Sequence, residues 1–72
     1  MPQLSAVQTK MARAALGWGV RDLAEKAKVA QDTISRLERG EPLRERTSQA
    51  IQVAFEAAGV EFLPANGVRL RN

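Results

Sequence analysis

Residues 23–40, LAEKAKVAQDTISRLERG, constrain the fold of this chain more than any other segment. Leu23, Ala24 and Ala27 recur at helical spacing, so they form an apolar stripe along one side of a short helix. The pattern then breaks, and Val29 is apolar although it lies in the break. Such a residue fills the corner between two helices, so a second helix is expected directly after it.

That second helical pattern has Ile34 and Leu37 facing the same core. Gly40 closes it where a helix end often needs a left-handed residue. The remaining positions are polar and lie on other faces: Gln31, Asp32, Ser35, Arg36 and Arg39. Two short helices joined by a tight turn, with a polar outer face on the second, have the layout of a helix-turn-helix. In that motif the second helix enters the major groove of DNA.

The same segment resembles the phage-repressor-like (Cro/XRE) helix-turn-helix family, whose usual run is Leu-Ala-x-x-x-Gly-Val-Ser-x-x-x-Ile-x-x-Leu-Glu-x-Gly. The resemblance covers the chain from about Met11 to Gly59. It implies a mainly α fold, a four-helix repressor-like helix-turn-helix domain, and a small bacterial transcriptional regulator. Members of this family are often encoded on phages and other mobile elements, and repression is their common mode of action.

Three residues depart from the family run. Lys28 stands where glycine is usual, so a lysine is expected to adopt a positive φ there at some cost in free energy. Ala30 stands where a Ser or Thr N-cap is usual, which costs ~1 kcal/mol of helix stability. Val20 stands where a glutamine often opens the second helix, which puts one common phosphate contact in doubt.

A capping box formed by Ser5 and Gln8 predicts a first helix from Ser5 to Leu16. Met11, Ala15 and Leu16 are expected to form its inward side. Further helices are predicted over residues 20–27, 31–39 and 46–58. The last of them carries its apolar residues on one side: Ile51, Ala54, Phe55 and Ala58. Residues 1–59 are therefore assigned to one helix-turn-helix domain, with the motif itself at about 20–39.

Residues 60–72 are assigned to a short C-terminal β-hairpin, because apolar and polar residues alternate on both sides of an Asn66-Gly67 turn signal. One face of the hairpin is apolar: Val60, Phe62, Val68 and Leu70. An isolated hairpin needs another surface to cover such a face, so the hairpin is expected to form the interface of a homodimer. The competing interpretation is a hairpin folded back on the last helix within one monomer.

Four residues at the start and on the outer face of the recognition helix are expected to contact bases: Gln31, Asp32, Ser35 and Arg36. Gln31 can bond bidentately to adenine, and Arg36 to O6 and N7 of guanine. The alternative interpretation is that Gln31 and Arg36 simply lie on an ordinary solvent-exposed face of the helix. Asp32 has two open roles. Its carboxylate can stabilise the helix by interacting favourably with the helix dipole in the first turn, or it can accept a hydrogen bond from a cytosine amino group.

A second group is expected to contact DNA phosphates: Arg21, Thr33, Arg39, Arg44 and Arg46. Such contacts set the register on DNA without carrying sequence information. Thr33 lies on the flank of the helix, where it can reach a phosphate or a thymine methyl group. In the resembled family the loop after the recognition helix grips the backbone, and Arg44 and Arg46 match basic positions there.

Arg13 and Glu38 are either ordinary surface charges or, as the resemblance implies, a structural ion pair between the first helix and the recognition helix. Such a pair would orient the recognition helix rather than add net stability. Trp18, which lies between two glycines, could bind a ligand. The favoured interpretation is that it covers a small core.

Composition sets wider limits. The 72 residues include no cysteine and no histidine, so the commonest metal ligands and the commonest general base are missing, and no enzyme, metal site or cofactor is expected. The net charge is only +3, which alone does not separate a DNA-binding protein from an ordinary basic domain. No long apolar run or signal-peptide pattern is present, so a cytoplasmic protein without membrane contact is expected, associated with the nucleoid when bound to DNA.

The function predicted from the sequence is a sequence-specific regulator that binds double-stranded DNA, most simply a repressor acting as a homodimer on a palindromic operator. No small-molecule effector is expected. The alternative is a protein-interaction module, an antitoxin or anti-activator that uses the same scaffold to hold a partner protein. A partner groove would favour exposed Leu, Met or aromatic residues on the recognition helix, whereas DNA reading predicts polar ones.

Overall fold

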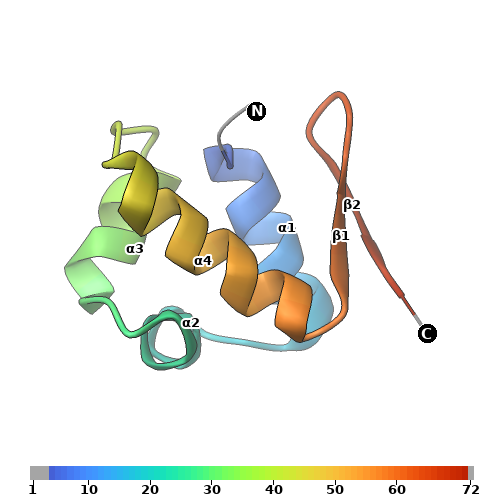
Figure 1. Cartoon of the computed structure of the whole chain (residues 1–72), viewed down its shortest axis with the longest axis horizontal. Coiled ribbons are helices and arrows are strands. Elements are labelled where there is room, and N and C mark those ends of the chain that lie inside the picture. The colour runs from blue at the N-terminus through green and yellow to red at the C-terminus, as the bar shows by residue number, and fades with distance from the viewer. Residues whose placement is uncertain (1–3, 72) are drawn as a thin grey trace.

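The computed structural model describes residues 4–71. In chain order its elements are α1 (Ala6–Leu16), α2 (Val20–Ala27), α3 (Gln31–Glu38), α4 (Glu45–Ala57), β1 (Val60–Leu63) and β2 (Gly67–Leu70). The predicted fold class, four helices followed by a hairpin, is confirmed. Figure 1 shows α2 and α3 toward one end of the long axis and the hairpin at the other, with α4 crossing between them. Four predicted boundaries move by one residue: α1 begins at Ala6 rather than Ser5, α3 ends at Glu38 rather than Arg39, and α4 begins at Glu45 rather than Arg46 and ends at Ala57 rather than Ala58.

The helix ends follow from local chemistry. Ser5 caps α1, because its hydroxyl accepts from the Gln8 N–H at 3.1 Å while the Gln8 side chain accepts from the Ser5 N–H at 3.2 Å. Gly17 ends α1 with a φ of 70°, a left-handed conformation that glycine adopts without strain. Asp22 performs the capping for α2 by accepting from the Gly19 N–H at 2.8 Å.

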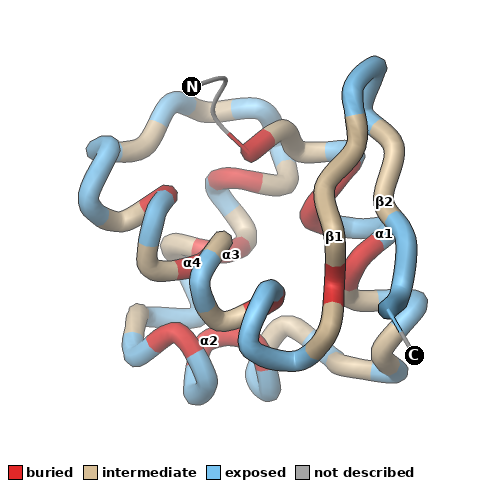
Figure 2. Tube along the Cα trace, turned by 45° about the vertical axis from the view of Figure 1, so that its right-hand side comes forward, coloured by how far each residue is buried: buried red, intermediate tan, exposed pale blue. Residues whose placement is uncertain are grey.

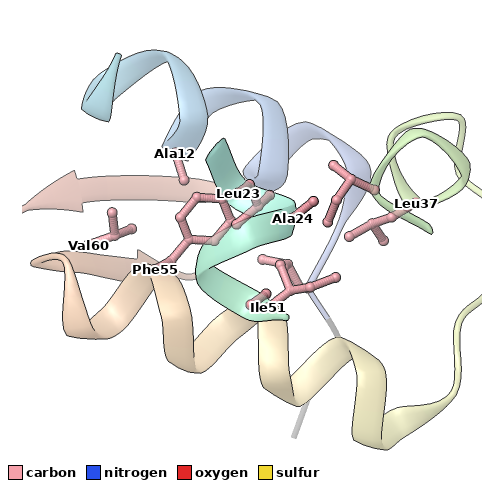
Figure 3. Close-up of a cluster of buried hydrophobic side chains, with 10 residues drawn as sticks. Ala12, Leu23, Ala24, Leu37, Ile51, Phe55 and Val60 are labelled. Carbon is pink, nitrogen blue, oxygen red and sulfur yellow. The ribbon is translucent and has the colours of Figure 1, made fainter. Parts of the chain in front are cut away.

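The core lies where the four helices and the hairpin meet (Figures 2 and 3). Its fully buried side chains include Leu23, Ile34, Ile51 and Phe55. Trp18 is half-buried and stacks on Phe55 with ring centroids 5.8 Å apart, so it covers the core as expected. The predicted stripe of α2 is buried as well.

The predicted inward side of α1 is wrong for Met11 and Ala15, which are exposed, whereas Leu16 is half-buried and packs against the core as predicted. The buried residues of this helix are Gln8, Thr9 and Ala12. Polar Gln8 and Thr9 are tolerated there because their hydrogen bonds are satisfied. The Thr9 hydroxyl donates to the Ser5 carbonyl at 2.9 Å, and Gln8 bonds to the hairpin. Ala58, expected on the inner side of the last helix, is exposed and caps its C-terminus.

The hairpin forms as predicted, with Val60 opposite Leu70 and Phe62 opposite Val68. Its loop differs in detail. Positive φ angles fall at Ala65 and Asn66 rather than at Asn66 and Gly67, and Leu63 pairs with Gly67 across the strands. A Cβ on Gly67 would lie 3.3 Å from the Leu63 Cβ, a tight contact, so this pairing rather than a left-handed turn favours a small residue here.

The apolar face of the hairpin is covered by the domain itself. Val60 is 1% exposed, and Phe62 and Val68 pack against the core, where the Phe62 ring meets Phe55 edge-on at 5.9 Å. Most of this face is therefore covered without a second chain, as in the competing interpretation of a hairpin folded back on the last helix, whereas the hairpin as the interface of a homodimer stays a prediction. The hairpin contacts two helices, because β1 packs on α4 and β2 packs on α1. Of the four predicted interface residues, Leu70 alone is classed as exposed, at 41%.

Candidate nucleic-acid interface

The turn between α2 and α3 depends on Lys28. This residue has a φ of 58°, as expected for a lysine that replaces the usual glycine. The left-handed turn lets the N–H of Val29 donate to Ala24 O at 3.0 Å and the N–H of Lys28 donate to Glu25 O at 3.3 Å. Val29 is half-buried against the core, so it fills the corner between the two helices.

Helix α3 separates its apolar and polar residues cleanly. Ile34 and Leu37 are buried, at 0% and 5% exposure, and hold the helix on the core. Gln31, Asp32 and Arg36 are exposed, whereas Ser35 is half-buried. The four predicted base-contacting residues thus lie off the core-facing side of one helix, with Ser35 the least accessible of them.

The start of α3 is left without a side-chain cap. Ala30 occupies the N-cap position with extended backbone angles and offers no hydrogen-bond acceptor from its side chain. The exposed first turn of α3 therefore keeps N–H groups that can bond to solvent or to a phosphate oxygen.

The predicted phosphate-contacting residues occupy different elements. Arg39 is the C-cap of α3, Arg44 is the N-cap of α4, and Arg46 lies in the first turn of α4. All three are exposed, so the segment that follows α3 carries a run of accessible cations. Arg21 is exposed in the first turn of α2, with Glu25 at 4.0 Å. Thr33 is half-buried on α3.

Arg13 and Glu38 form the ion pair that the resemblance implied. Arg13 Nε donates to one Glu38 carboxylate oxygen at 2.6 Å and Nη2 donates to the other at 2.8 Å, a bidentate geometry. Only 21% of the arginine side chain and 10% of the glutamate side chain are exposed. The hydrogen bond to Glu38 raises the pKa of Arg13, with burial opposing it. Because Arg13 Nη1 also donates to Trp18 O at 3.1 Å, the pair ties the end of α3 to the end of α1.

Glu41 joins the polar surface although the sequence did not single it out. Its carboxylate accepts from Arg36 Nε at 3.2 Å and from Arg39 Nη2 at 3.0 Å. The hydrogen bond from Arg39 lowers the pKa of Glu41 most, followed by the bond from Arg36. The one sequence signal was the acid placed directly after Gly40, within reach of both arginines across the end of the helix.

Two kinds of feature are absent from residues 4–71. Over that part of the chain no helix is long and apolar enough to cross a membrane. Within the same range no cluster of three or more acidic, histidine or cysteine side chains could hold a metal ion.

Comparison with known proteins gives a family match. A family model described as helix-turn-helix, of the Cro/C1 type, matches residues 10–58. No curated protein and no solved structure matches the chain. The matched residues run from α1 through α4 and leave out the hairpin.

Proposed function

Because this chain belongs to the Cro/XRE-type helix-turn-helix family and is a DNA-binding regulator, we propose that it is a repressor that binds a palindromic operator as a homodimer. The observation that carries the proposal is the surface of α3, where Gln31, Asp32 and Arg36 are exposed while Ile34 and Leu37 hold the helix on the core. Polar side chains on a helix held from one side suit the major groove, which accepts one α-helix.

In this proposal α3 reads the bases and its neighbours grip the backbone. Gln31 bonds to adenine, Arg36 bonds to guanine, and Asp32 and Ser35 contact neighbouring base edges. Arg39, Arg44 and Arg46 hold the phosphates beside the recognition helix, with Arg21 and Thr33 at the flanks.

The length of α3 supports a dimer. Its 8 residues span about 12 Å, and a base pair rises about 3.4 Å, so one helix meets only about four base pairs. Two helices one DNA turn apart, ~34 Å, read enough sequence for a specific site and match a palindrome.

The alternative, a module that holds a protein partner through α3, has less support. The large hydrophobic residues exposed in the described part of the chain are Val7, Met11, Val53 and Leu70, on α1, α4 and β2. The outer side of α3 offers no such anchor, and protein–protein interfaces rely on apolar and aromatic anchors.

Selection of bound sites from random duplex DNA would test the proposal and define the half-site spacing. On the selected duplex, Arg36→Ala should weaken binding by ~1–3 kcal/mol and relax the preference at one base pair. Arg44→Ala should weaken binding to all sequences and lower the salt slope by about one unit. If Arg36→Ala leaves the ranking of operator variants unchanged, the assignment of base reading to Arg36 is wrong.

A further inference from the structure

The end of α3 holds Glu41 at a defined place beside the polar surface of the helix. Gly40 has a φ of 88°, and this left-handed turn lets the Gly40 N–H donate to Leu37 O at 2.9 Å and the Glu41 N–H donate to Arg36 O at 3.0 Å. The backbone of Glu41 is therefore bonded to the residue that its side chain also contacts. A carboxylate on a free loop would lack this constraint.

The carboxylate of Glu41 uses its two oxygens on two different arginines. Oε1 accepts from Arg36 Nε at 3.2 Å, while Oε2 accepts from Arg39 Nε at 3.2 Å and from Arg39 Nη2 at 3.0 Å. The two pairs leave different donors free. Arg36 is held by Nε alone, and over residues 4–71 its terminal Nη1 and Nη2 make no hydrogen bond. Arg39 is engaged through a whole edge of its guanidinium group.

We propose that Glu41 is a specificity-determining residue that positions Arg36 for base reading and weakens the phosphate contact of Arg39 by competing for its guanidinium group. The proposal rests on the proposed binding of DNA by α3. Anchored by Nε, Arg36 loses less freedom on binding and still presents both terminal amino groups to O6 and N7 of guanine. Arg39 must exchange Glu41 for a phosphate, so its sequence-independent contribution to affinity is reduced.

The ionisation of Glu41 is consistent with this role. The bonds from Arg39 and Arg36 hold the pKa of the Glu41 carboxyl below its usual value. A carboxylate with a lowered pKa stays charged through neutral and mildly acidic pH and loses its pairing only as the pH falls through that lowered value. Both contacts are therefore present under the conditions of a DNA-binding measurement.

The experiment compares Glu41→Gln with the wild-type full chain on the selected duplex and on a random duplex, by fluorescence anisotropy over a series of salt concentrations. Glu45→Gln is the matched control, because it removes the same charge from the same region of the chain, and Glu45 makes no ion pair within residues 4–71. We expect Glu41→Gln to lower the ratio of specific to random affinity about 5- to 10-fold, mostly through tighter random binding. Its salt slope on random DNA should steepen by about one unit, and Arg39→Ala should abolish that steepening.

Three outcomes of the binding experiment would overturn the proposal. A Glu41→Gln ratio within about twofold of wild type, on a chain that does prefer its selected duplex, removes the role of Glu41 alone. An equal fall in the ratio for Glu45→Gln shows a general charge effect. A wild-type chain that prefers no duplex overturns the proposed function, and this inference with it.

Carboxyl chemical shifts followed against pH report on the contacts of Glu41 without DNA. The Glu41 pKa should rise in Arg36→Ala and in Arg39→Ala, and a value that does not move rules the pairing out.

Discussion

At the scale of single residues, Lys28 adopts a left-handed backbone conformation at a position where glycine is usual in the family. Its φ of 58° lies in a region that side chains with a Cβ rarely adopt. Glycine adopts this angle without strain, and its greater conformational freedom in the unfolded chain offsets only part of that gain. We therefore expect Lys28→Gly to raise the free energy of unfolding by about 0.5–1 kcal/mol. Urea melts would measure the change.

The control for this prediction is Lys26→Gly. Lys26 is exposed in the last turn of α2, where glycine should lower the free energy of unfolding by about 0.5–1 kcal/mol. Equal losses in the two variants would mean that the left-handed angle of Lys28 carries no strain. The left-handed angle was predictable from the family resemblance, because glycine is usual at the position of Lys28.

At the scale of elements, the Arg13–Glu38 pair ties α1 to α3. Arg13→Leu and Glu38→Leu should each cost ~1–3 kcal/mol of unfolding free energy, because each leaves a partly desolvated charge without its partner. The double variant should recover much of the loss. A double-mutant cycle in urea melts measures the coupling, and the exposed pair Arg69–Glu61 is the control, with an expected coupling below ~1 kcal/mol.

The pH dependence of that coupling is also defined. A raised pKa in the folded state means that the Arg13 contribution is fully present below its unfolded value and is lost only as the pH rises through the raised folded value. The coupling should therefore stay constant through neutral and moderately alkaline pH. A coupling energy near zero would mean that Arg13 and Glu38 are ordinary surface charges.

Gln8 links α1 to the hairpin, and hydrophobic periodicity did not reveal it. Its Nε2 donates to Leu63 O at 3.3 Å and to Gly67 O at 3.2 Å, while its Oε1 caps Ser5. Gln8→Glu keeps the capping acceptor but removes the donor, so it should cost ~1–3 kcal/mol and speed amide exchange in the hairpin. Ser5→Ala, which removes the cap alone, should leave hairpin exchange unchanged. Equal exchange in the two variants would count against a docking role for Gln8.

At the scale of the whole molecule, the recognition helix and the hairpin lie toward opposite ends of the long axis, so contacts at one need not disturb the other (Figure 1). Leu70 stays exposed opposite Val60 and is the predicted interface residue best placed to meet a second copy. If the hairpin forms the dimer, Leu70→Glu should dissociate it and weaken binding to a two-half-site operator. Sedimentation equilibrium would measure the dimer, and binding to the two-half-site operator, compared with binding to a single half-site, would measure the loss of affinity.

The variant is chosen because a truncation after Gly59 would also remove Val60 and Phe62 from the core. Val53→Glu is the control, since Val53 is the most exposed large hydrophobic residue in the described range and lies on α4. A Leu70→Glu chain that remains dimeric would exclude the hairpin as the interface, and a monomeric Val53→Glu chain would place the interface on α4.

The sequence by itself determined the local features of this protein. The two helices of the motif were predictable from periodicity within one or two turns of the chain. The left-handed Lys28 and the uncapped Ala30 were predictable from the resemblance of this segment to the family run, in which glycine and a Ser or Thr are usual at these positions. The polar surface of α3 was predictable for the same reason. Once Ile34 and Leu37 face the core, helical geometry sets the direction of their neighbours.

Only the tertiary structure decided which surfaces were covered. Val7 and Met11 are apolar but exposed, whereas Gln8 and Thr9 are polar but buried, because α1 packs by the face that can bond to the hairpin and to its own first turn. The hairpin covers its apolar face on its own domain for a related reason. Phe62 packs on Phe55 of the preceding helix, whereas β2 packs on α1, which lies far away along the sequence. Contacts across such separations leave no local periodic signal.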